Sequence, residues 1–245
     1  MIRPPLRALT FDLDDTLWPV DDVLAAAEET LHDYLRSAYP AVAARFGPED
    51  SRRLRRELAA GNPELTRNAS TLRRATMREM AHRCGLAGRD AERFVERTFE
   101  VFLEARQAGV APYPEVLPAL ARLAERFQIG IITNGNADIH RTELGPYVGF
   151  VVRGVDLDIP KPEPAIFTYA CRCAGVAPGE VLHVGDDPHV DAAGALSAGL
   201  QAALLHRGAP PDPPAEAPAC LTVPDMAALS RVIEQCLDAV TPERR

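Results

Sequence analysis

Lysine is almost missing from this chain of 245 residues: Lys161 is the single lysine among 27 basic side chains, and the others are arginines. Positive charge is also in deficit, because 35 acidic residues leave a formal net charge of -8. A chain with this excess of negative charge is poorly suited to the phosphate contacts that hold DNA or RNA. We therefore expect no nucleic-acid partner.

Cysteines and long apolar runs are scarce as well. The five cysteines are an odd number without the spacing of a zinc ribbon, which favours reduced thiols in a cytoplasmic protein. The apolar run that follows Arg3 and Arg7 is interrupted by Asp12 before it reaches the length of a signal-peptide core, and no other run is long enough to cross a bilayer. We expect a cytoplasmic location and no membrane partner. The content of 47% hydrophobic and 25% charged residues is that of an ordinary globular protein.

Short apolar runs alternate with segments of helical periodicity over most of the chain. Expected strands cover residues 8–13, 129–133, 150–152, 181–184 and 202–205. Expected helices cover residues 114–126, 137–144, 164–174 and 191–198. This order predicts an α/β fold, a three-layer Rossmann-like core with a parallel sheet whose ligand site lies at the carboxyl ends of the strands.

One region interrupts the alternation. Residues 19–111 contain no convincing strand, and their apolar residues recur at helical spacing, which predicts an all-helical insertion between core segments 1–18 and 112–245. The insertion is rich in arginine, and pairing with nearby glutamates on solvated helix faces explains most of these residues. Arg74 and Arg78, one turn apart, stay unassigned. Near the other end of the chain, residues 208–218 form a proline-rich connection before a last helix at 225–239.

Polar residues follow the expected strands. Asp12 and Asp14 stand two apart after the first strand and point to the same side, where their charges repel each other unless a cation neutralises them. Thr133 ends the second strand, and Asn134 begins a turn whose backbone amides can bind an anion, although an ordinary turn with a helix cap is the alternative.

Lys161 lies between two prolines just before an expected helix, where a cation opposes the helix dipole. We therefore expect a negative group beside it. Asp186, Asp187 and Asp191 gather after the fourth strand; Asp186 is the metal candidate, and Asp191 is as readily a helix N-cap. His183 is expected to be packed within its strand, and His189 receives no role.

Clustered carboxylates without cysteine or paired histidine ligands favour a hard cation such as Mg²⁺, which commonly works together with a phosphate. The combination predicts phosphoryl transfer: one carboxylate attacks phosphorus, and a second one donates and later accepts a proton. Lys161, Thr133 and backbone amides would offset the charge of the phosphoryl oxygens. The expected partner is a small phosphorylated metabolite; the oligomeric state is left open.

Four blocks, FDLDDTL, ITNGN, KP and HVGDDPHVD, resemble in type and order those of the haloacid dehalogenase superfamily of phosphatases. The resemblance implies that Asp12 is the nucleophile and Asp14 the general acid and base, and that the helical insertion is a cap placed after the first motif. It further implies roles for a set of neighbouring residues: Thr133, Asn134 and Lys161 as phosphate ligands, Asp12, Asp14 and Asp186 as metal ligands, and Asp187 and Asp191 as their support.

Within the superfamily, ALTFDLDDTLW, ITNGNA and HVGDD are most similar to the branch that hydrolyses flavin mononucleotide and the phosphorylated ribitylamino-uracil intermediate of riboflavin synthesis. Trp18 offers a ring that stacks on a flavin, but a hinge or interface aromatic is the simpler interpretation.

Three alternatives remain open. A 2-haloacid dehalogenase shares the nucleophilic aspartate, but in that family the second carboxylate position is not Asp, which disfavours it here because Asp14 is present. A sugar-phosphate mutase uses the same core and a similar cap, so the sequence does not separate it from a phosphatase. A receiver-type signalling module also combines an acidic pair, a hydroxyl and a lysine, but has no long helical insertion after its first strand.

Overall fold

The computed structural model describes residues 2–207 and 220–238. Two compact units make up the chain: one consists of Met1–Pro19 and Ala111–Arg245, and the other is Val20–Val110. Within the described residues, no helix has both the length and the apolar content needed to cross a bilayer. The expected connection at 208–218 and residue 239 of the expected last helix lie outside the described residues.

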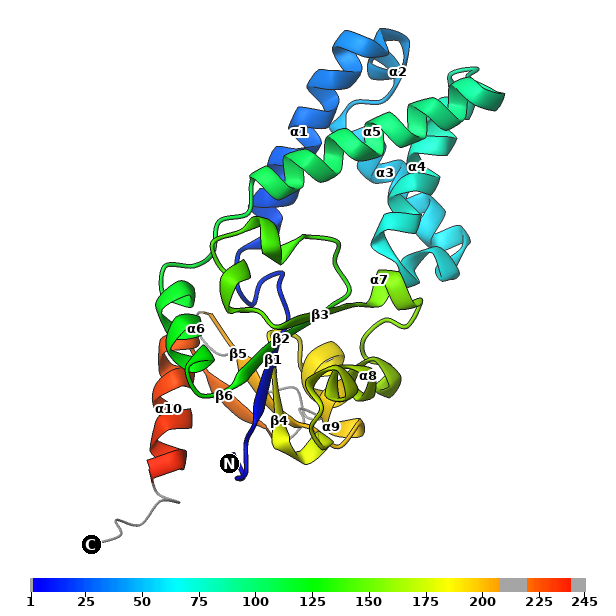
Figure 1. Cartoon of the computed structure of the whole chain (residues 1–245). Helices are drawn as coiled ribbons and strands as arrows, with labels where there is room; N and C mark the ends of the chain where they lie inside the picture. The colour runs from blue at the N-terminus through cyan, green and yellow to red at the C-terminus, as the bar shows by residue number, and fades with distance from the viewer. Residues whose placement is uncertain (1, 208–219, 239–245) are drawn as a thin grey trace, which may run out of the picture. The chain divides into compact units, whose positions relative to one another are not determined.

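The first unit is built on a sheet of six parallel strands (Figure 1). These are β1 (Ala8–Phe11), β2 (Gln128–Thr133), β3 (Phe150–Arg153), β4 (Val181–Gly185), β5 (Gln201–Leu205) and β6 (Leu221–Val223). Their order is β3-β2-β1-β4-β5-β6. β1 is central, with β2 on one side and β4 on the other, so the chain reverses its direction of winding beside β1, where such sheets place their ligands. The predicted parallel α/β core is confirmed.

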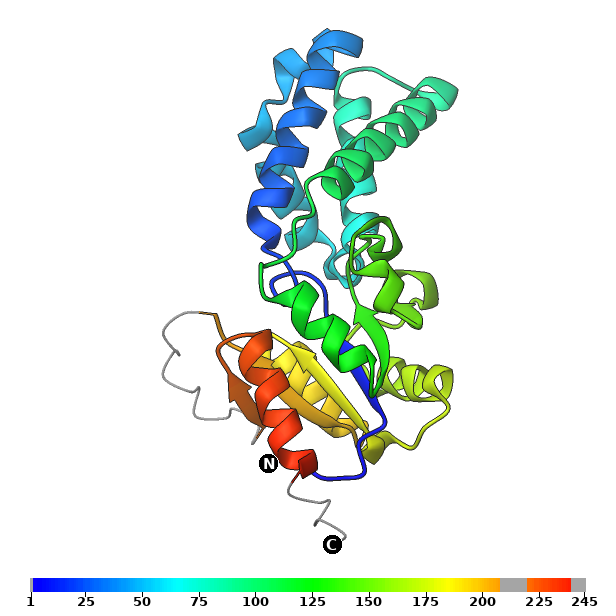
Figure 2. The same cartoon turned by 60° about the vertical axis from the view of Figure 1, so that its left-hand side comes forward.

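Helices cover both faces of this sheet, as Figures 1 and 2 show. α6 (Val116–Ala124) and α10 (Met226–Asp238) pack together on one face, while α8 (Pro164–Ala174) and α9 (Gly194–Ser197) cover the other. Because both faces are covered, β1, β4 and β5 are buried at every position, which explains their nearly continuous apolar sequences. A four-residue helix, α7 (Gly154–Leu157), follows β3.

Two expectations for this unit were wrong in detail, and one strand was missed. No helix fills residues 137–144, which instead contain the short 3₁₀ turn Ile139–Arg141, because the Asp138 side chain caps it and Thr142 is already extended. The expected helix at 191–198 begins earlier, as a π-helical segment over Pro188–Ala193 that leads into α9. β6 was missed, since its three residues are too few for a recognisable pattern.

The second unit is helical throughout its regular structure. Its elements are α1 (Val20–Ala38), α2 (Pro40–Arg45), α3 (Pro48–Gly61), α4 (Ala69–Arg83) and α5 (Gly88–Ala108), with a 3₁₀ turn at Pro63–Arg67. α5 packs against α1 and α4, and α3 packs against α4. The apolar stripe of α5, which includes Phe94, Phe99 and Phe102, is buried in the core of this unit, because these residues recur on one helix face.

Candidate active site at the carboxyl end of the sheet

All eight residues to which the sequence assigns a site role line one cavity of about 170 Å³. They come from loops that leave the carboxyl ends of neighbouring strands: Asp12 and Asp14 after β1, Thr133 and Asn134 at β2, and Asp186, Asp187 and Asp191 after β4, with Lys161 from the loop before α8. β1 pairs with both β2 and β4, so these loops emerge side by side.

Lys161 lies between two carboxylates. Its Nζ is 2.7 Å from Oδ1 of Asp12 and 2.6 Å from Oδ1 of Asp191, and its side chain is 2% exposed. Burial alone would lower the pKa of Lys161, but Asp12 and Asp191 outweigh it and raise the pKa above its usual value. The negative partners expected from the position of this lysine are therefore two aspartates, the half-buried Asp12 and the buried Asp191.

The pKa of Asp12 is raised, whereas a neighbouring lysine ordinarily lowers the pKa of an aspartate. Burial is the largest cause and raises the pKa of Asp12 to about 7; Lys161 opposes this rise, while the charges of Asp191 and Asp14 add to it. The carboxylate of Asp12 thus sits among more negative charge than a single ammonium group offsets. A cation bound beside Asp12 would favour its ionised form.

Asp191 is not the N-cap that the sequence allows. That position belongs to Asp187, whose Oδ1 accepts hydrogen bonds from the backbone N–H groups of His189 and Val190, both at 2.7 Å. Asp191 lies inside the π-helical segment and turns its carboxylate towards Lys161, while its Oδ2 accepts the N–H of Asp187 at 3.1 Å. Gly185 permits this approach, because a Cβ there would lie 2.1 Å from Cγ of Asp191.

His183 is buried, as expected, but it also belongs to the network behind Lys161. Its Nε2 lies 3.2 Å from Oδ1 of Asp191, and its Nδ1 lies 3.0 Å from Oγ1 of Thr10 on β1. Burial lowers the pKa of His183, although Asp191 opposes the shift. Burial would raise the pKa of Asp191, yet Lys161 and His183 together hold it below its usual range. In the sequence, only the alternation of side chains along β1 and β4 could have suggested that Thr10 and His183 lie on the same face of the sheet.

Trp18 has a role that its sequence position did not reveal. The indole is 0% exposed, and its Nε1–H donates a hydrogen bond to Oδ1 of Asp14 at 2.9 Å. A fully buried ring in this structure has no open face on which a flavin could stack. Trp18 instead fixes the orientation of the Asp14 carboxylate.

The side chain of Asn134 is engaged with the backbone of Lys161. Its Nδ2 donates to the carbonyl oxygen of Lys161 at 2.9 Å, and its Oδ1 accepts the N–H of Lys161 at 2.8 Å. Oγ1 of Thr133 accepts the N–H of Gly135 at 2.9 Å. The two hydrogen bonds of Asn134 therefore tie the lysine loop to the end of β2.

The charge and donor set of the cavity fit a hard cation. Its lining includes five aspartates and one lysine, and carboxylate oxygens of Asp12, Asp186 and Asp191 lie within 4.8 Å of one another. Burial raises the pKa of Asp186 to about 6, although a 2.8 Å hydrogen bond from Thr16 opposes the rise. The Asp14 carboxylate lies outside this group of three. Asp12 and Asp186 are the better-placed ligands, because Oδ1 of Asp191 contacts both Lys161 and His183, whereas Asp12 contacts only the first of these two.

Comparison with known proteins shows to which family this chain belongs. Residues 6–199 match the model of the haloacid dehalogenase-like hydrolases. The chain belongs to this family. It is 32% identical over 200 residues to the 5-amino-6-(5-phospho-D-ribitylamino)uracil phosphatase YigB of Escherichia coli K12, covering 82% of this chain and 83% of that protein.

Two other relatives of this hydrolase are a phosphatase and a protein described as a dehalogenase. The glyceraldehyde 3-phosphate phosphatase of Methanopyrus kandleri is 30% identical over 210 residues, which cover 83% of this chain and 85% of that protein. A crystal structure described as a 2-haloacid dehalogenase from Pseudomonas syringae pv. tomato DC3000 is 35% identical, with a TM-score of 0.84 over 94% of this chain and 99% of that one. The predicted superfamily and the predicted enzyme class, a hydrolase of phosphate monoesters, are confirmed.

Proposed function

We propose that this hydrolase is a Mg²⁺-dependent phosphatase that cleaves a small phosphomonoester through an aspartyl-phosphate on Asp12. The observation that carries the proposal is the placement of Asp12 against the Lys161 ammonium group in a cavity that Asp14 also lines. A nucleophile, a cation beside it and a second acid are the groups that phosphoryl transfer to a carboxylate requires.

The first step forms a bond between a carboxylate oxygen of Asp12 and phosphorus. Oδ1 of Asp12 is paired with Lys161, so we assign the attack to Oδ2. The bond from phosphorus to the ester oxygen breaks, and Asp14 donates a proton to that leaving oxygen. The products of this step are the free alcohol and a phosphorylated Asp12.

The second step hydrolyses the aspartyl-phosphate. Asp14, now deprotonated, accepts a proton from a water molecule that attacks phosphorus, and the bond from phosphorus to Asp12 breaks. Inorganic phosphate leaves and both carboxyl groups return to their starting states. The hydrogen bond from Trp18 orients Asp14 for both proton transfers.

Positive charge near phosphorus comes from two sources in this proposal. Lys161 is held in place by Asp191 and, through its backbone, by Asn134, so the ammonium group does not have to reorganise during the reaction. Mg²⁺ held by Asp12 and Asp186, when bound, supplies further charge that offsets the phosphoryl oxygens. Thr133 and the backbone amides of the following turn complete the phosphate site.

The proposed substrate is flavin mononucleotide or a related phosphate of riboflavin synthesis. The 32% identity to a relative named for 5-amino-6-(5-phospho-D-ribitylamino)uracil supports this class, as do the motif stretches around Asp12, Thr133 and Asp186. We also propose a cytoplasmic location, which the five free cysteines support.

A second candidate function is dehalogenation of a 2-haloacid, favoured by the structural relative that is 35% identical. In such a reaction Asp12 would attack carbon and release a halide, with no need for Asp14. The presence of Asp14, and the hydrogen bond that orients it, favour the phosphatase.

A screen of phosphorylated metabolites and an aryl phosphate, with Mg²⁺ and with chelator, tests the proposal, and chloride release from 2-chloropropionate is measured in parallel. We expect Mg²⁺-dependent phosphate release, no chloride release, and loss of at least about 10⁴-fold of turnover in Asp12→Asn. Substantial activity in Asp12→Asn, or chloride release without phosphatase activity, would overturn it.

A further inference from the structure

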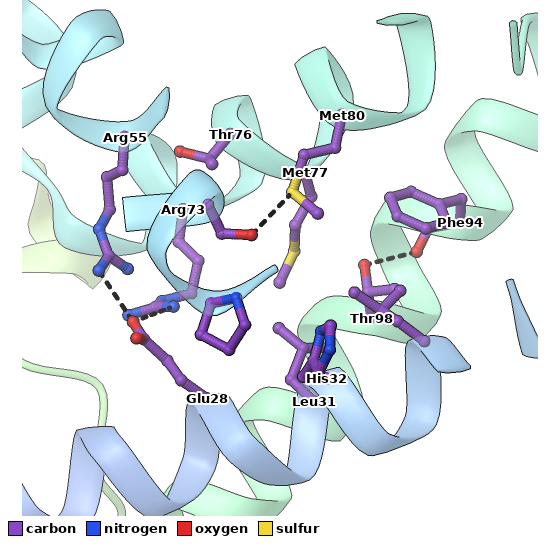
Figure 3. A pocket seen from close by; sticks show the side chains of 13 residues that line it. Glu28, Leu31, His32, Arg55, Arg73, Thr76, Met77, Met80, Phe94 and Thr98 are labelled. Atoms are coloured by element: carbon purple, nitrogen blue, oxygen red, sulfur yellow. Dashed lines mark hydrogen bonds and ion pairs between the residues drawn. The ribbon is translucent and has the colours of Figure 1, made fainter. Parts of the chain in front are cut away.

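A cavity of about 40 Å³ lies within the helical unit, among α1, α3, α4 and α5 (Figure 3). One end of its lining is charged and comprises Glu28 from α1, Arg55 from α3 and Arg73 from α4. The lining away from these charges is mostly apolar, with Leu31, Met77, Met80 and Phe94, and it also includes the imidazole of His32.

The charged end has more cations than its single carboxylate offsets. Oε1 of Glu28 lies 2.8 Å from Nη2 of Arg55 and 3.4 Å from both Nη atoms of Arg73, while Oε2 of Glu28 lies 2.9 Å from Nε of Arg52. Arg52 has a second partner in Glu49, on its own helix. Among the residues that the structure describes, no other carboxylate pairs with Arg55 or Arg73.

The pKa of Arg73 reflects this excess of positive charge. Burial, followed by the charge of Arg55, lowers the pKa of Arg73 to about 10, and Glu28 opposes this shift only in part. A second anion at this end would relieve the repulsion between the two guanidinium groups.

The Arg73 guanidinium group is also held in place before any ligand arrives. Its Cζ lies 3.6 Å from the centre of the Phe102 ring, so the planar group stacks on an aromatic face. A fixed guanidinium fork matches the two oxygens of a carboxylate, and it loses little side-chain entropy when it binds one.

The other residues that line the cavity determine which chemical group can be attached to the bound anion. The hydroxyl groups of Thr76 and Thr98 donate to backbone carbonyl oxygens, those of Leu72 and Phe94, so they are not donors towards the cavity. Met77 and Met80 present flexible apolar side chains that adapt to a small apolar group. Because one water molecule needs roughly 10–15 Å³ of such space, the cavity holds only a few heavy atoms.

We propose that this cavity binds a small organic carboxylate, whose oxygens pair with Arg55 and Arg73 and whose short apolar tail contacts Met77 and Met80. The carboxylate is that of a free short-chain acid. Inorganic phosphate matches the cationic end but not the apolar wall. The proposal concerns binding within the helical unit and does not depend on the phosphatase reaction.

The test uses the full-length protein with ¹³C-labelled methionine methyl groups, observed by NMR during titration with acetate, propionate and butyrate at constant ionic strength. The chain has four methionines, of which Met77 and Met80 line the cavity and Met226 is buried in α10 of the other unit. We expect saturable shifts of the Met77 and Met80 signals and none of Met226. Absence of saturable shifts, or equal responses to inorganic phosphate and propionate, would overturn the proposal.

Two arginines of α3 provide matched variants. Arg55→Gln removes a proposed ligand, whereas Arg53→Gln removes an arginine whose partners are Asp50 and Glu57 and which does not line the cavity. Calorimetry should show at least about tenfold weaker propionate binding in Arg55→Gln and less than about twofold change in Arg53→Gln. Equal weakening in both variants would reduce the effect to general charge and contradict the proposal.

Ser51→Leu is the alternative test variant if Arg55→Gln does not fold. Ser51 lines the cavity, and a leucine there fills the space while leaving both guanidinium groups in place, so propionate binding should be lost. Retained binding in this variant would contradict the proposal.

Discussion

The two units of this chain contain cavities with opposite charge arrangements. In the sheet unit, one ammonium group, that of Lys161, lies between two carboxylates in a cavity lined by five aspartates. In the helical unit, one carboxylate, that of Glu28, pairs with three guanidinium groups. The first arrangement calls for additional positive charge, and the second calls for an additional anion.

The difference also explains which cation each cavity uses. Arginine is the common base of this chain, and its planar fork serves the helical unit, where a flat carboxylate is to be bound. The single lysine is placed where one compact charge must contact Oδ1 atoms of two different aspartates at 2.6 and 2.7 Å. A broad guanidinium group does not fit between two carboxylates at these distances.

Among substitutions that exchange one cation of these cavities for another, Lys161→Arg should have the largest effect. We expect Lys161→Arg to fold but to lose about 10²-fold or more in kcat, because the guanidinium group displaces Asp12 from its position for attack. Circular dichroism and steady-state kinetics on the best substrate of the screen check this result. Activity within about twofold of the parent would mean that the lone lysine is a coincidence of composition.

Metal binding should depend on pH in the sheet unit. The pKa values of Asp12 and Asp186, about 7 and about 6, both exceed the value of about 3.9 expected in the unfolded chain. Their contribution to the stability of the metal-free protein is therefore complete below pH of about 4 and is lost as the pH rises through 6 to 7.

Because Mg²⁺ binds the ionised carboxylates, its stabilising effect should grow over the same interval. The Tm difference between Mg²⁺ and chelator should be several degrees at about pH 8 and much smaller at about pH 5.5, as scanning calorimetry can measure. The Asp186→Asn variant is the control, since it should lose most of the Mg²⁺ effect. A Tm difference independent of pH would contradict the assignment of these two ligands.

The sequence predicted the structural features that neighbouring residues determine, but not those that depend on contacts between residues far apart in the chain. The parallel core followed from apolar runs, because a strand buried on both faces leaves a local signature in its own residues. Asp12 and Lys161 were recognisable from their positions after a strand and before a helix. The 3₁₀ turn at Ile139–Arg141 and the π-helical segment at Pro188–Ala193 were not, because single side-chain caps and long-range contacts decide them.

Side-chain contacts between distant residues were equally hidden. Asn134 was predicted as a phosphate ligand, but nothing local shows that its amide holds the backbone of Lys161. The arginines of the helical unit were interpreted as solvated, and several form surface pairs such as that of Arg53 with Asp50. Arg55 and Arg73 differ because α3 and α4 bring them to the same oxygen of Glu28, which sequence periodicity alone does not reveal.

Trp18→Phe should have a smaller effect than the lysine exchange. Phenylalanine keeps most of the buried volume but removes the 2.9 Å hydrogen bond to Asp14, so we expect kcat to fall about tenfold with KM nearly unchanged. The double variant with Asp14→Asn should lose no more than Asp14→Asn alone, because the indole acts through that carboxylate. Additive losses would assign Trp18 a purely structural role.

The smallest expected effect is that of Arg55→Lys in the helical unit. Lysine retains the charge but not the fork, so propionate binding should weaken about threefold to fivefold, less than in Arg55→Gln. Calorimetry on both variants provides the comparison. Identical affinities of Arg55→Lys and the parent would show that charge alone, and not carboxylate geometry, governs this cavity.

The central claim, phosphoryl transfer to Asp12, is tested most directly by mass spectrometry of the acid-quenched Asp14→Asn variant after mixing with an aryl phosphate and Mg²⁺. An aryl leaving group needs little protonation, whereas hydrolysis of the aspartyl-phosphate needs the missing base, so the intermediate should accumulate. The account predicts one phosphoryl group on the peptide that contains Asp12. Release of phosphate without any adduct on Asp12, or an adduct on another residue, would contradict it.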